Sequence, residues 1–229
     1  MSSHVILLHG LARTSLSMRR LARRLAAEGF TTDNFDYPSR KDRIEPLART
    51  VIERARERAA AKSGPVHFVT HSMGGMLVRS YLKQHKLDRL GRVVMLAPPN
   101  QGTEVVDFYN LRAPLLGRML RSVLGPASGQ MRTDADALPA RLGPANFEVG
   151  IIAGTVNRNP VFGPVISSMP SDGVVTVERT KLAGMSDFLA LPYTHTFIMD
   201  KVVVQDQVLH FLRHGRFRRE AAAALATTP

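Results

Sequence analysis

Six short runs of apolar and β-branched residues recur along the chain, and longer amphipathic segments separate them. Runs of about four to eight such residues between turn-forming residues are typical of buried strands. We therefore predict strands at residues 4–8, 30–36, 66–70, 92–97, 147–153 and 188–191.

Between several of these runs, apolar residues recur every three or four positions, which is the period of one face of an α-helix. Residues 18–25 and 44–55 form two such series. Further helices are predicted from directly after residue 72 to about residue 85, and over residues 201–214. This alternation predicts an α/β fold with a mostly parallel sheet of about six strands and helices on both of its faces.

Residues 100–146 interrupt this alternation with a long stretch rich in Leu, Arg, Gly and Pro. Long insertions in compact domains are often functional. Residues 101–147 are therefore either a small cap or lid over a pocket, or an ordinary crossover helix with irregular flanks. Because no internal repeat or linker is present, residues 1–215 are predicted to form a single domain, and residues 216–229 a flexible tail.

Composition places the chain among ordinary globular proteins, since its 229 residues are 44% hydrophobic and 22% charged. No apolar run reaches the roughly 18–20 residues of a transmembrane helix. The N-terminus leads into the first predicted strand without a secretory signal, so we expect a cytoplasmic protein. Because cysteine is absent, disulfides and thiolate chemistry are excluded, and a nucleophile has to be a hydroxyl, carboxylate or amine.

The net charge of +12 raises the question of a polyanionic partner. Basic residues are spread over residues 19–24, 40–58 and 213–219, mostly on polar faces of predicted helices and without interleaved aromatic residues. This distribution favours a solvated surface over nucleic-acid binding, and leaves peripheral contact with anionic lipid open. No cofactor or metal is expected, since the chain lacks cysteine ligands and an acidic calcium-binding loop. The oligomeric state is left open.

The first candidate for chemistry is a serine between a predicted strand and a predicted helix, in the segment Val66–Leu77. This segment resembles the nucleophile elbow of α/β-hydrolases, G-x-S-x-G, in which the serine occupies a sharp, strained turn above the sheet. Gly74 and Gly75, which follow Ser72, lack a Cβ atom and let the helix pack close to the strands. Thr70 stands where the motif has its first glycine, so either the turn opens slightly or neighbouring side chains are small. A serine at this point also suits a plain helix N-cap.

A second feature is the His-Gly step that ends the first predicted strand, in the segment Val5–Leu11. Many α/β-hydrolases of the lipase and esterase kind carry a similar step. The resemblance implies that the backbone amides of Leu11 and Met73 form an oxyanion hole. It also implies that His9 shapes the loop, while the base comes from near the C-terminus.

A candidate acid and a candidate base follow later in the chain. Asp172 lies in a Ser-Asp-Gly-Val-Val step after a predicted strand, and His195 lies between the last predicted strand and the last predicted helix. The order Ser, acid, His is that of α/β-hydrolases. By this resemblance Ser72 is the nucleophile, His195 the base and Asp172 the acid. Competing acids that lack the same flanking features are Asp134, Asp136, Asp187 and Asp200.

The remaining histidines are expected to be packing or surface residues. His71 is next to Ser72, but neighbouring side chains diverge at a tight turn, so His71 is predicted to point away from the nucleophile. The others lie in predicted strands or at helices: His4, His67, His85, His210 and His214.

Together with residues 9–14, 36–39 and 96–102, these segments make the chain similar to compact bacterial lipases and esterases. The similarity implies a minimal α/β-hydrolase fold and a serine hydrolase that cleaves carboxylic esters of small molecules or lipids through an acyl-enzyme on Ser72. The alternatives are an acyltransferase with the same acyl-enzyme, and a non-catalytic protein that binds lipid or another anionic surface. Residues that either line an acyl pocket or belong to the core are Leu115, Leu116, Val161, Phe162 and Ile166.

Overall fold

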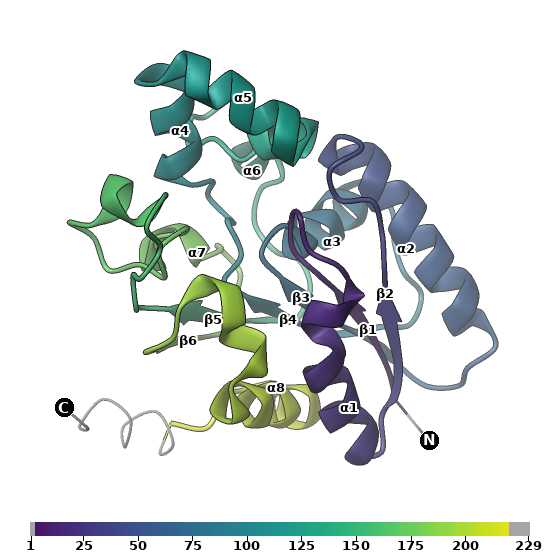
Figure 1. Cartoon of the computed structure of the whole chain (residues 1–229). Coiled ribbons are helices and arrows are strands. Elements are labelled where there is room, and N and C mark those ends of the chain that lie inside the picture. The colour runs from purple at the N-terminus through teal and green to yellow at the C-terminus, as the bar shows by residue number, and fades with distance from the viewer. Residues whose placement is uncertain (1–2, 220–229) are drawn as a thin grey trace.

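The computed structural model describes residues 3–219, which form a six-stranded parallel sheet in the order β2-β1-β3-β4-β5-β6 (Figure 1). Each neighbouring pair of strands is parallel. The six predicted strands are confirmed, each to within two residues at either end. The strands are β1 (His4–Leu8), β2 (Thr31–Phe35), β3 (Val66–His71), β4 (Leu90–Leu96), β5 (Val149–Gly154) and β6 (Asp187–Leu191).

Helices cover both faces of this sheet, which confirms the predicted α/β fold (Figure 1). On one face lie α1 (Arg19–Ala27) and α8 (Val202–His214), and on the other lie α2 (Ile44–Ala60) and α3 (Met73–Gln84). The remaining α-helices are α4 (Glu104–Leu111), α5 (Pro114–Leu124), α6 (Leu138–Arg141) and α7 (Val177–Thr180). Short 3-10 helices are Ser15–Met18, Pro126–Gln130, Gly163–Ile166 and His195–Asp200.

The alternation of side chains along β1 shows how the core divides between the two faces of the sheet. Ile6 and Leu8 pack with α2 and α3, whereas Val5 and Leu7 pack with α1 and α8. All of these side chains are fully buried. A strand that is covered on both faces needs apolar residues at every position, and this is why the strands were visible as continuous apolar runs.

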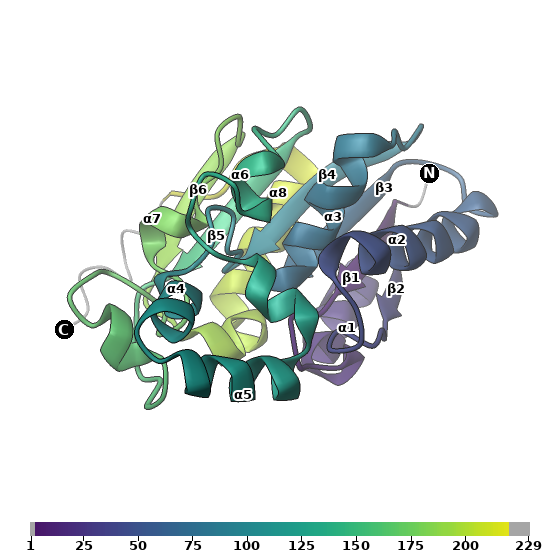
Figure 2. The ribbon, with the colours of Figure 1, turned by 90° about the horizontal axis from the view of Figure 1, so that it is seen from above.

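The long stretch between β4 and β5 forms α4, α5, the short α6 and a 3-10 helix rather than a single crossover helix, and α4 and α5 are its longest elements. They lie above the carboxyl end of the sheet and nearest the viewer in Figure 2. Thr103 caps α4 by accepting a hydrogen bond from the Val105 amide (3.3 Å). We call α4 and α5 the cap.

Buried Arg79 of α3 fixes the two ends of the cap segment. Its guanidinium donates hydrogen bonds to the carbonyl groups of Asn100 (2.6 Å), Pro139 (3.1 Å) and Gly143 (2.8 Å). Burial lowers the pKa of Arg79 to about 10, so the side chain remains charged at neutral pH. The start and the end of the cap segment are therefore both bound to the same buried guanidinium, that of Arg79.

The predicted tail, residues 216–229, is described only as far as residue 219. Within residues 216–219, Phe217 is buried against Phe211 of α8, and its amide donates a hydrogen bond to Asp187 (2.7 Å). This part of the chain is packed on the domain. Residues 220–229 lie outside the described residues.

In residues 3–219 the structure contains no helix that is both long and apolar enough to cross a membrane. The same residues contain no group of three or more potential metal-binding side chains. His210 and His214, one turn apart on α8, have ring centroids 4.5 Å apart, and no third ligand joins them in this part of the chain.

Candidate active site

Ser72 forms the sharp turn between β3 and α3, with φ 51° and ψ −122°. A positive φ is unfavourable for a residue with a Cβ atom, so neighbouring contacts have to hold it. The Ser72 amide donates to the carbonyl group of Leu96 at the end of β4 (2.8 Å), and its carbonyl group accepts from Gly75 (3.0 Å). This strained backbone raises the hydroxyl above the carboxyl end of the sheet.

Two glycines allow α3 to begin at this turn. A Cβ atom on Gly74 would lie 2.8 Å from the carbonyl oxygen of Leu8 and 2.9 Å from that of His9. A Cβ atom on Gly75 would lie 3.3 Å from the hydroxyl oxygen of Thr70. The departure from the motif at Thr70 is therefore accommodated by a small neighbour, and that neighbour is Gly75.

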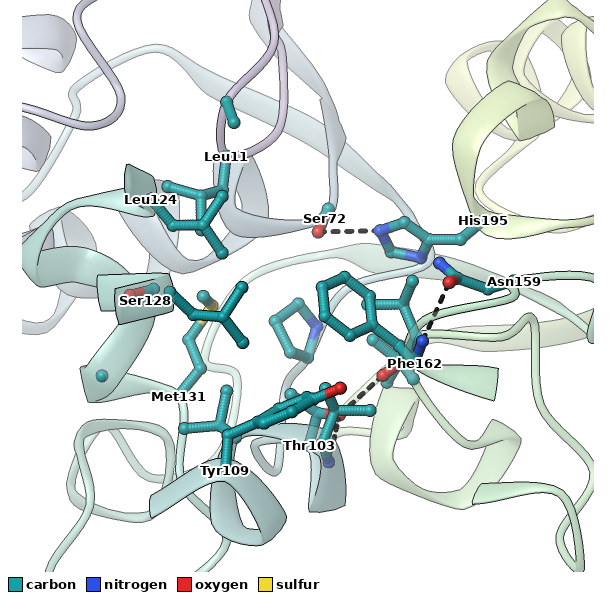
Figure 3. A pocket seen from close by; sticks show the side chains of 18 of the residues that line it. Leu11, Ser72, Thr103, Tyr109, Leu124, Ser128, Met131, Asn159, Phe162 and His195 are labelled. Atoms are coloured by element: carbon teal, nitrogen blue, oxygen red, sulfur yellow. Dashed lines mark hydrogen bonds between the residues drawn. The ribbon is translucent and has the colours of Figure 1, made fainter. Parts of the chain in front are cut away.

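A chain of hydrogen bonds joins three of the candidate residues. Nε2 of His195 lies 3.1 Å from Oγ of Ser72 (Figure 3). Nδ1 of His195 lies 2.7 Å from Oδ2 of Asp172. Asp172 is buried, and His195 is exposed by only 9%. We call these three residues the Ser–His–Asp array. They come from loops after β3, β5 and β6, which meet at one edge because the strands are parallel.

Backbone groups orient the acid and the imidazole of this array. Oδ1 of Asp172 accepts hydrogen bonds from the amides of Val174 (2.9 Å) and Val175 (2.8 Å), which leaves Oδ2 for His195. The His195 amide also donates to the Asp172 carbonyl group (3.0 Å). Because the carboxylate accepts at Nδ1, the neutral imidazole carries its proton there and has a lone pair on Nε2 facing Ser72.

His71 does not point away from the site, so that prediction is wrong. Its Nε2 lies 3.0 Å from the carbonyl oxygen of His195, its ring is 4.9 Å from the His195 ring, and it lines the same pocket. Burial, and then the neighbouring His195, hold the pKa of His71 well below its usual range. His71 is therefore a neutral donor that supports the His195 backbone. The prediction assumed that neighbouring side chains diverge at a tight turn, but the turn at Ser72 leaves His71 and Ser72 lining the same pocket.

His9 packs beside the array without joining it. Its ring stacks on Tyr37 with centroids 4.0 Å apart, and its Nε2 accepts a hydrogen bond from the Tyr37 amide (3.3 Å). Burial lowers the pKa of His9. A Cβ atom on the next residue, Gly10, would lie 2.9 Å from Nδ1 of His71, so the loop passes close to the array only because residue 10 is glycine.

The backbone amides of Leu11 and Met73 donate to no protein acceptor among the described residues. Leu11 lines the pocket beside Ser72. Met73 follows Ser72 directly and is the first residue of α3, where amides have no acceptor within the helix.

The array opens into a pocket of about 300 Å³ beneath the cap (Figure 3). Besides the array, the loops at the strand ends contribute Leu11 and Val175. The cap contributes one cationic side chain to the pocket lining, Arg121, which is hydrogen-bonded to Asn110. Apolar residues of the lining are Val106, Tyr109, Leu120, Leu124, Met131 and Phe162.

Of the five apolar residues singled out from the sequence, only Phe162 lines this pocket. Ile166 is buried in a small cluster with Val105 and Tyr109. The other three face solvent, with exposed fractions of 80% for Leu115, 40% for Leu116 and 56% for Val161. Lining residues that the sequence did not single out include Leu120 and Leu124, which lie further along α5.

Solved structures with a similar fold include bacterial lipases and esterases. The mature lipase BlEst2 from Bacillus licheniformis has a TM-score of 0.70 at 19% identity, over 91% of both chains. Phospholipase PlaB from Legionella pneumophila has a TM-score of 0.73 at 17% identity, over 98% of this chain and 62% of that one. The metagenomic carboxyl esterase MGS0156 has a TM-score of 0.64 at 19% identity, over 85% and 64%.

Among curated protein sequences none matches significantly. The model of one protein family, described as the alpha/beta hydrolase family, matches residues 5–226, which is nearly the full chain. The parallel sheet, the turn at Ser72 and this match agree, and the chain belongs to the alpha/beta hydrolase family.

Proposed function

We propose that the protein is a carboxylic ester hydrolase in which Ser72 becomes acylated. The observation that carries this proposal is the position of His195, whose two ring nitrogens lie within hydrogen-bond distance of Ser72 and Asp172. A serine hydroxyl is a weak nucleophile at neutral pH and needs an adjacent base. The lipase, phospholipase and carboxyl esterase among the similar structures support the same class of reaction.

In the first step Oγ of Ser72 attacks the acyl carbon while Nε2 of His195 takes the hydroxyl proton. Asp172 stabilises the imidazolium that forms. The tetrahedral intermediate then breaks its bond to the alcohol oxygen, which receives the proton from Nε2. Water repeats the sequence on the acyl-enzyme, releasing the carboxylic acid and restoring Ser72.

The amides of Leu11 and Met73 would hold the negative charge on the acyl oxygen. Neither donates to a protein group among the described residues, and both adjoin Ser72. The first turn of α3 adds the positive end of its dipole to the same place. Loss of one such donor typically costs about 3–4 kcal/mol of transition-state stabilisation.

The acyl group would occupy the apolar pocket beneath the cap. Aromatic and aliphatic side chains such as Tyr109, Leu124 and Phe162 line it. Of its two cations, Arg121 is hydrogen-bonded to Asn110, and Arg13 donates to the carbonyl group of Thr196. Burial of each methylene group in such a pocket contributes about 0.8 kcal/mol. We propose that the cap, together with the rest of residues 101–147, covers the acyl pocket.

The proposal is tested with p-nitrophenyl butyrate and a fluorophosphonate probe. Ser72→Ala and His195→Ala should each lower kcat by roughly 10⁴-fold or more. Labelling by the probe should be lost in Ser72→Ala. The matched control is Ser63→Ala, because Ser63 is exposed and distant from the pocket lining.

Retained turnover in folded Ser72→Ala would reject Ser72 as the nucleophile. Absence of both turnover and labelling in the wild-type protein would favour a non-catalytic binding protein. Product analysis with added glycerol separates the remaining alternative, because an acyltransferase forms mainly the glycerol ester and a hydrolase mainly the free acid.

A further inference from the structure

A second hollow adjoins the acyl pocket, and Ala12 and Arg13 line both of them. This groove has a volume of about 710 Å³ and runs between residues 12–20 and residues 197–201. Figure 1 shows the corresponding segments, the start of α1 and the turn before α8, next to each other. The groove is lined by four cationic side chains and one carboxylate: Arg13, Arg19, Arg20, Lys201 and Asp200.

Arg13 stands at the junction of pocket and groove and is held in place there. Its guanidinium donates a hydrogen bond to the carbonyl group of Thr196 (3.2 Å) and lies 5.8 Å from the centre of the Phe197 ring. The side chain is only partly exposed. These two contacts use one of its five N–H donors, and the others remain available to a ligand.

The groove cations have no carboxylate partner among residues 3–219, and this separates them from a neighbouring arginine on α1. Arg24 pairs with Glu28 (3.3 Å) and with Asp206 (3.2 Å). No ion pair of this kind involves Arg13, Arg19, Arg20 or Lys201. Their charge is therefore left to attract an anion that enters the groove.

The proposed reaction places the leaving alcohol on this side of the array. The alcohol oxygen takes its proton from Nε2 of His195, and the chain after His195 continues through Thr196 and Phe197 into the wall of the groove. The acyl part has its own apolar pocket on the other side, beneath the cap. A polar or charged alcohol would thus extend past His195 towards Arg13.

We propose that the groove binds a phosphate group carried by the leaving alcohol, so that the preferred substrates are carboxylic esters of phosphorylated alcohols. Guanidinium groups pair with phosphate oxygens through two parallel hydrogen bonds, and the additional cations add long-range attraction. This inference rests on the ester hydrolase function proposed above and names its substrate class.

The test compares two esters with the same acyl chain, octanoylglycerol and octanoylglycerol 3-phosphate, both below the concentration at which they aggregate. Release of octanoate gives kcat/KM for each. We expect wild-type protein to prefer the phosphorylated ester by roughly tenfold or more, as for a charge-assisted hydrogen bond. Raising the ionic strength from about 0.05 M to about 0.5 M should reduce this preference.

Variants of the groove cations, compared with a variant of one arginine outside the groove, test whether the groove causes the preference for the phosphorylated ester. Arg13→Gln should lower the ratio of the two kcat/KM values by roughly tenfold, and Arg13→Lys by less, because lysine keeps the charge and loses the paired donors. The double variant Arg19→Gln/Arg20→Gln should lower it by about two- to threefold. Arg23→Gln removes the same charge from α1 outside the groove and should leave the ratio unchanged.

Competition identifies the part of the alcohol that is recognised. Glycerol 3-phosphate should inhibit octanoylglycerol hydrolysis competitively in the wild-type protein and much more weakly in Arg13→Gln. Equal inhibition by inorganic phosphate would mean that the phosphate alone is bound, which supports the groove as a phosphate site. Weaker inhibition by inorganic phosphate would mean that the glycerol contributes, which also supports it.

Equal kcat/KM values for the two esters in the wild-type protein would overturn the inference, as would an equal loss in Arg13→Gln and Arg23→Gln. In either case hydrolysis of octanoylglycerol would leave the proposed function intact. If neither of these esters nor p-nitrophenyl butyrate is hydrolysed, the proposed function fails. Calorimetric titration with glycerol 3-phosphate then still tests whether the groove binds phosphate. Binding to the wild-type protein that is lost in Arg13→Gln would support the phosphate site. Absence of binding to the wild-type protein would reject it.

Discussion

The Ser–His–Asp array and the cap meet at one pocket, but the structure holds them in different ways. The array lies at the carboxyl end of the sheet, and the two clusters of buried residues beneath it span the whole sheet. The cap packs in a small separate cluster around Val105 and Tyr109, to which Ile166 of the loop after β5 also belongs, and the segment is tied to the body by Arg79. On its outer side Leu115 and Met119 are 80% and 57% exposed.

This difference reflects what each region has to do. The array depends on distances of about 3 Å and on the direction of lone pairs, so its backbone is fixed by strained or glycine-dependent turns. A cover for an apolar acyl group needs only an apolar wall of suitable volume. We therefore expect substitutions in the array to remove activity, and substitutions in the cap to change which esters are accepted.

The largest expected effect comes from Asp172→Asn. The amides of Val174 and Val175 select the oxygen of the new side chain, so its NH₂ group faces Nδ1 of His195 and turns the imidazole into the wrong tautomer. We expect kcat for p-nitrophenyl butyrate to fall roughly 10⁴-fold with little change in melting temperature. Asp136→Asn, an exposed position in the cap segment, is the control. A loss of less than tenfold would argue against the role of Asp172.

A pair of glycine variants compares the two regions directly. In Gly74→Ala the new Cβ atom meets two backbone carbonyl groups under the array, and the free energy of unfolding should fall by about 1–3 kcal/mol. In Gly117→Ala it meets the Tyr109 carbonyl group, which pushes α5 away from α4. Because the cap has its own cluster, we expect a higher KM for long-chain esters and a smaller loss of stability. Urea titration and an ester panel measure both, and equal destabilisation would show that the cap is not separable.

Acid should weaken the body of the fold and not the cap, because four histidines whose pKa is lowered by burial lie in or next to the sheet: His4, His9, His67 and His71. With their pKa below the usual 6.5, the folded state binds fewer protons than the unfolded chain in mildly acidic solution. The contribution of these histidines to the free energy of unfolding is therefore fully present above about pH 6.5, and it is lost progressively as the pH falls below that value.

Urea titrations at about pH 5 and about pH 7.5 measure this decline. In His71→Gln the decline should be smaller, because one buried group that resists protonation is gone. His210→Gln, at a partly exposed position of α8, should change the decline less than His71→Gln does. A decline of the same size in His71→Gln and the wild-type protein would contradict the assignment to His71.

The smallest effect is expected on the outer side of the cap. Met119 is more than half exposed, so Met119→Gln should change the free energy of unfolding by less than about 0.5 kcal/mol. Hydrolysis of p-nitrophenyl butyrate should also stay unchanged. A loss of more than about 1 kcal/mol would show that this side is packed in solution, against the exposed position in the structure.

Most of the sheet was predictable because buried parallel strands leave short apolar runs. The residues of the array were predictable through the resemblance to α/β-hydrolases, since Ser72, Asp172 and His195 follow predicted strands in the order of that family. The cap was not predictable in the same way. Helix α5 carries leucine on both sides, with Leu115 outside and Leu120 inside, so its composition does not indicate which side faces the pocket.

The sequence by itself determined the alternation of strands and helices, and with it the edge of the sheet where the candidate residues gather. Only the tertiary structure decided that His71 supports His195, that Gly75 makes room for Thr70, and that Arg13 lies between a basic groove and the pocket beneath the cap. The physical reason is that periodicity along a chain reports burial on one face of one element. A distance between residues 71 and 195, or 13 and 196, depends on how the elements pack.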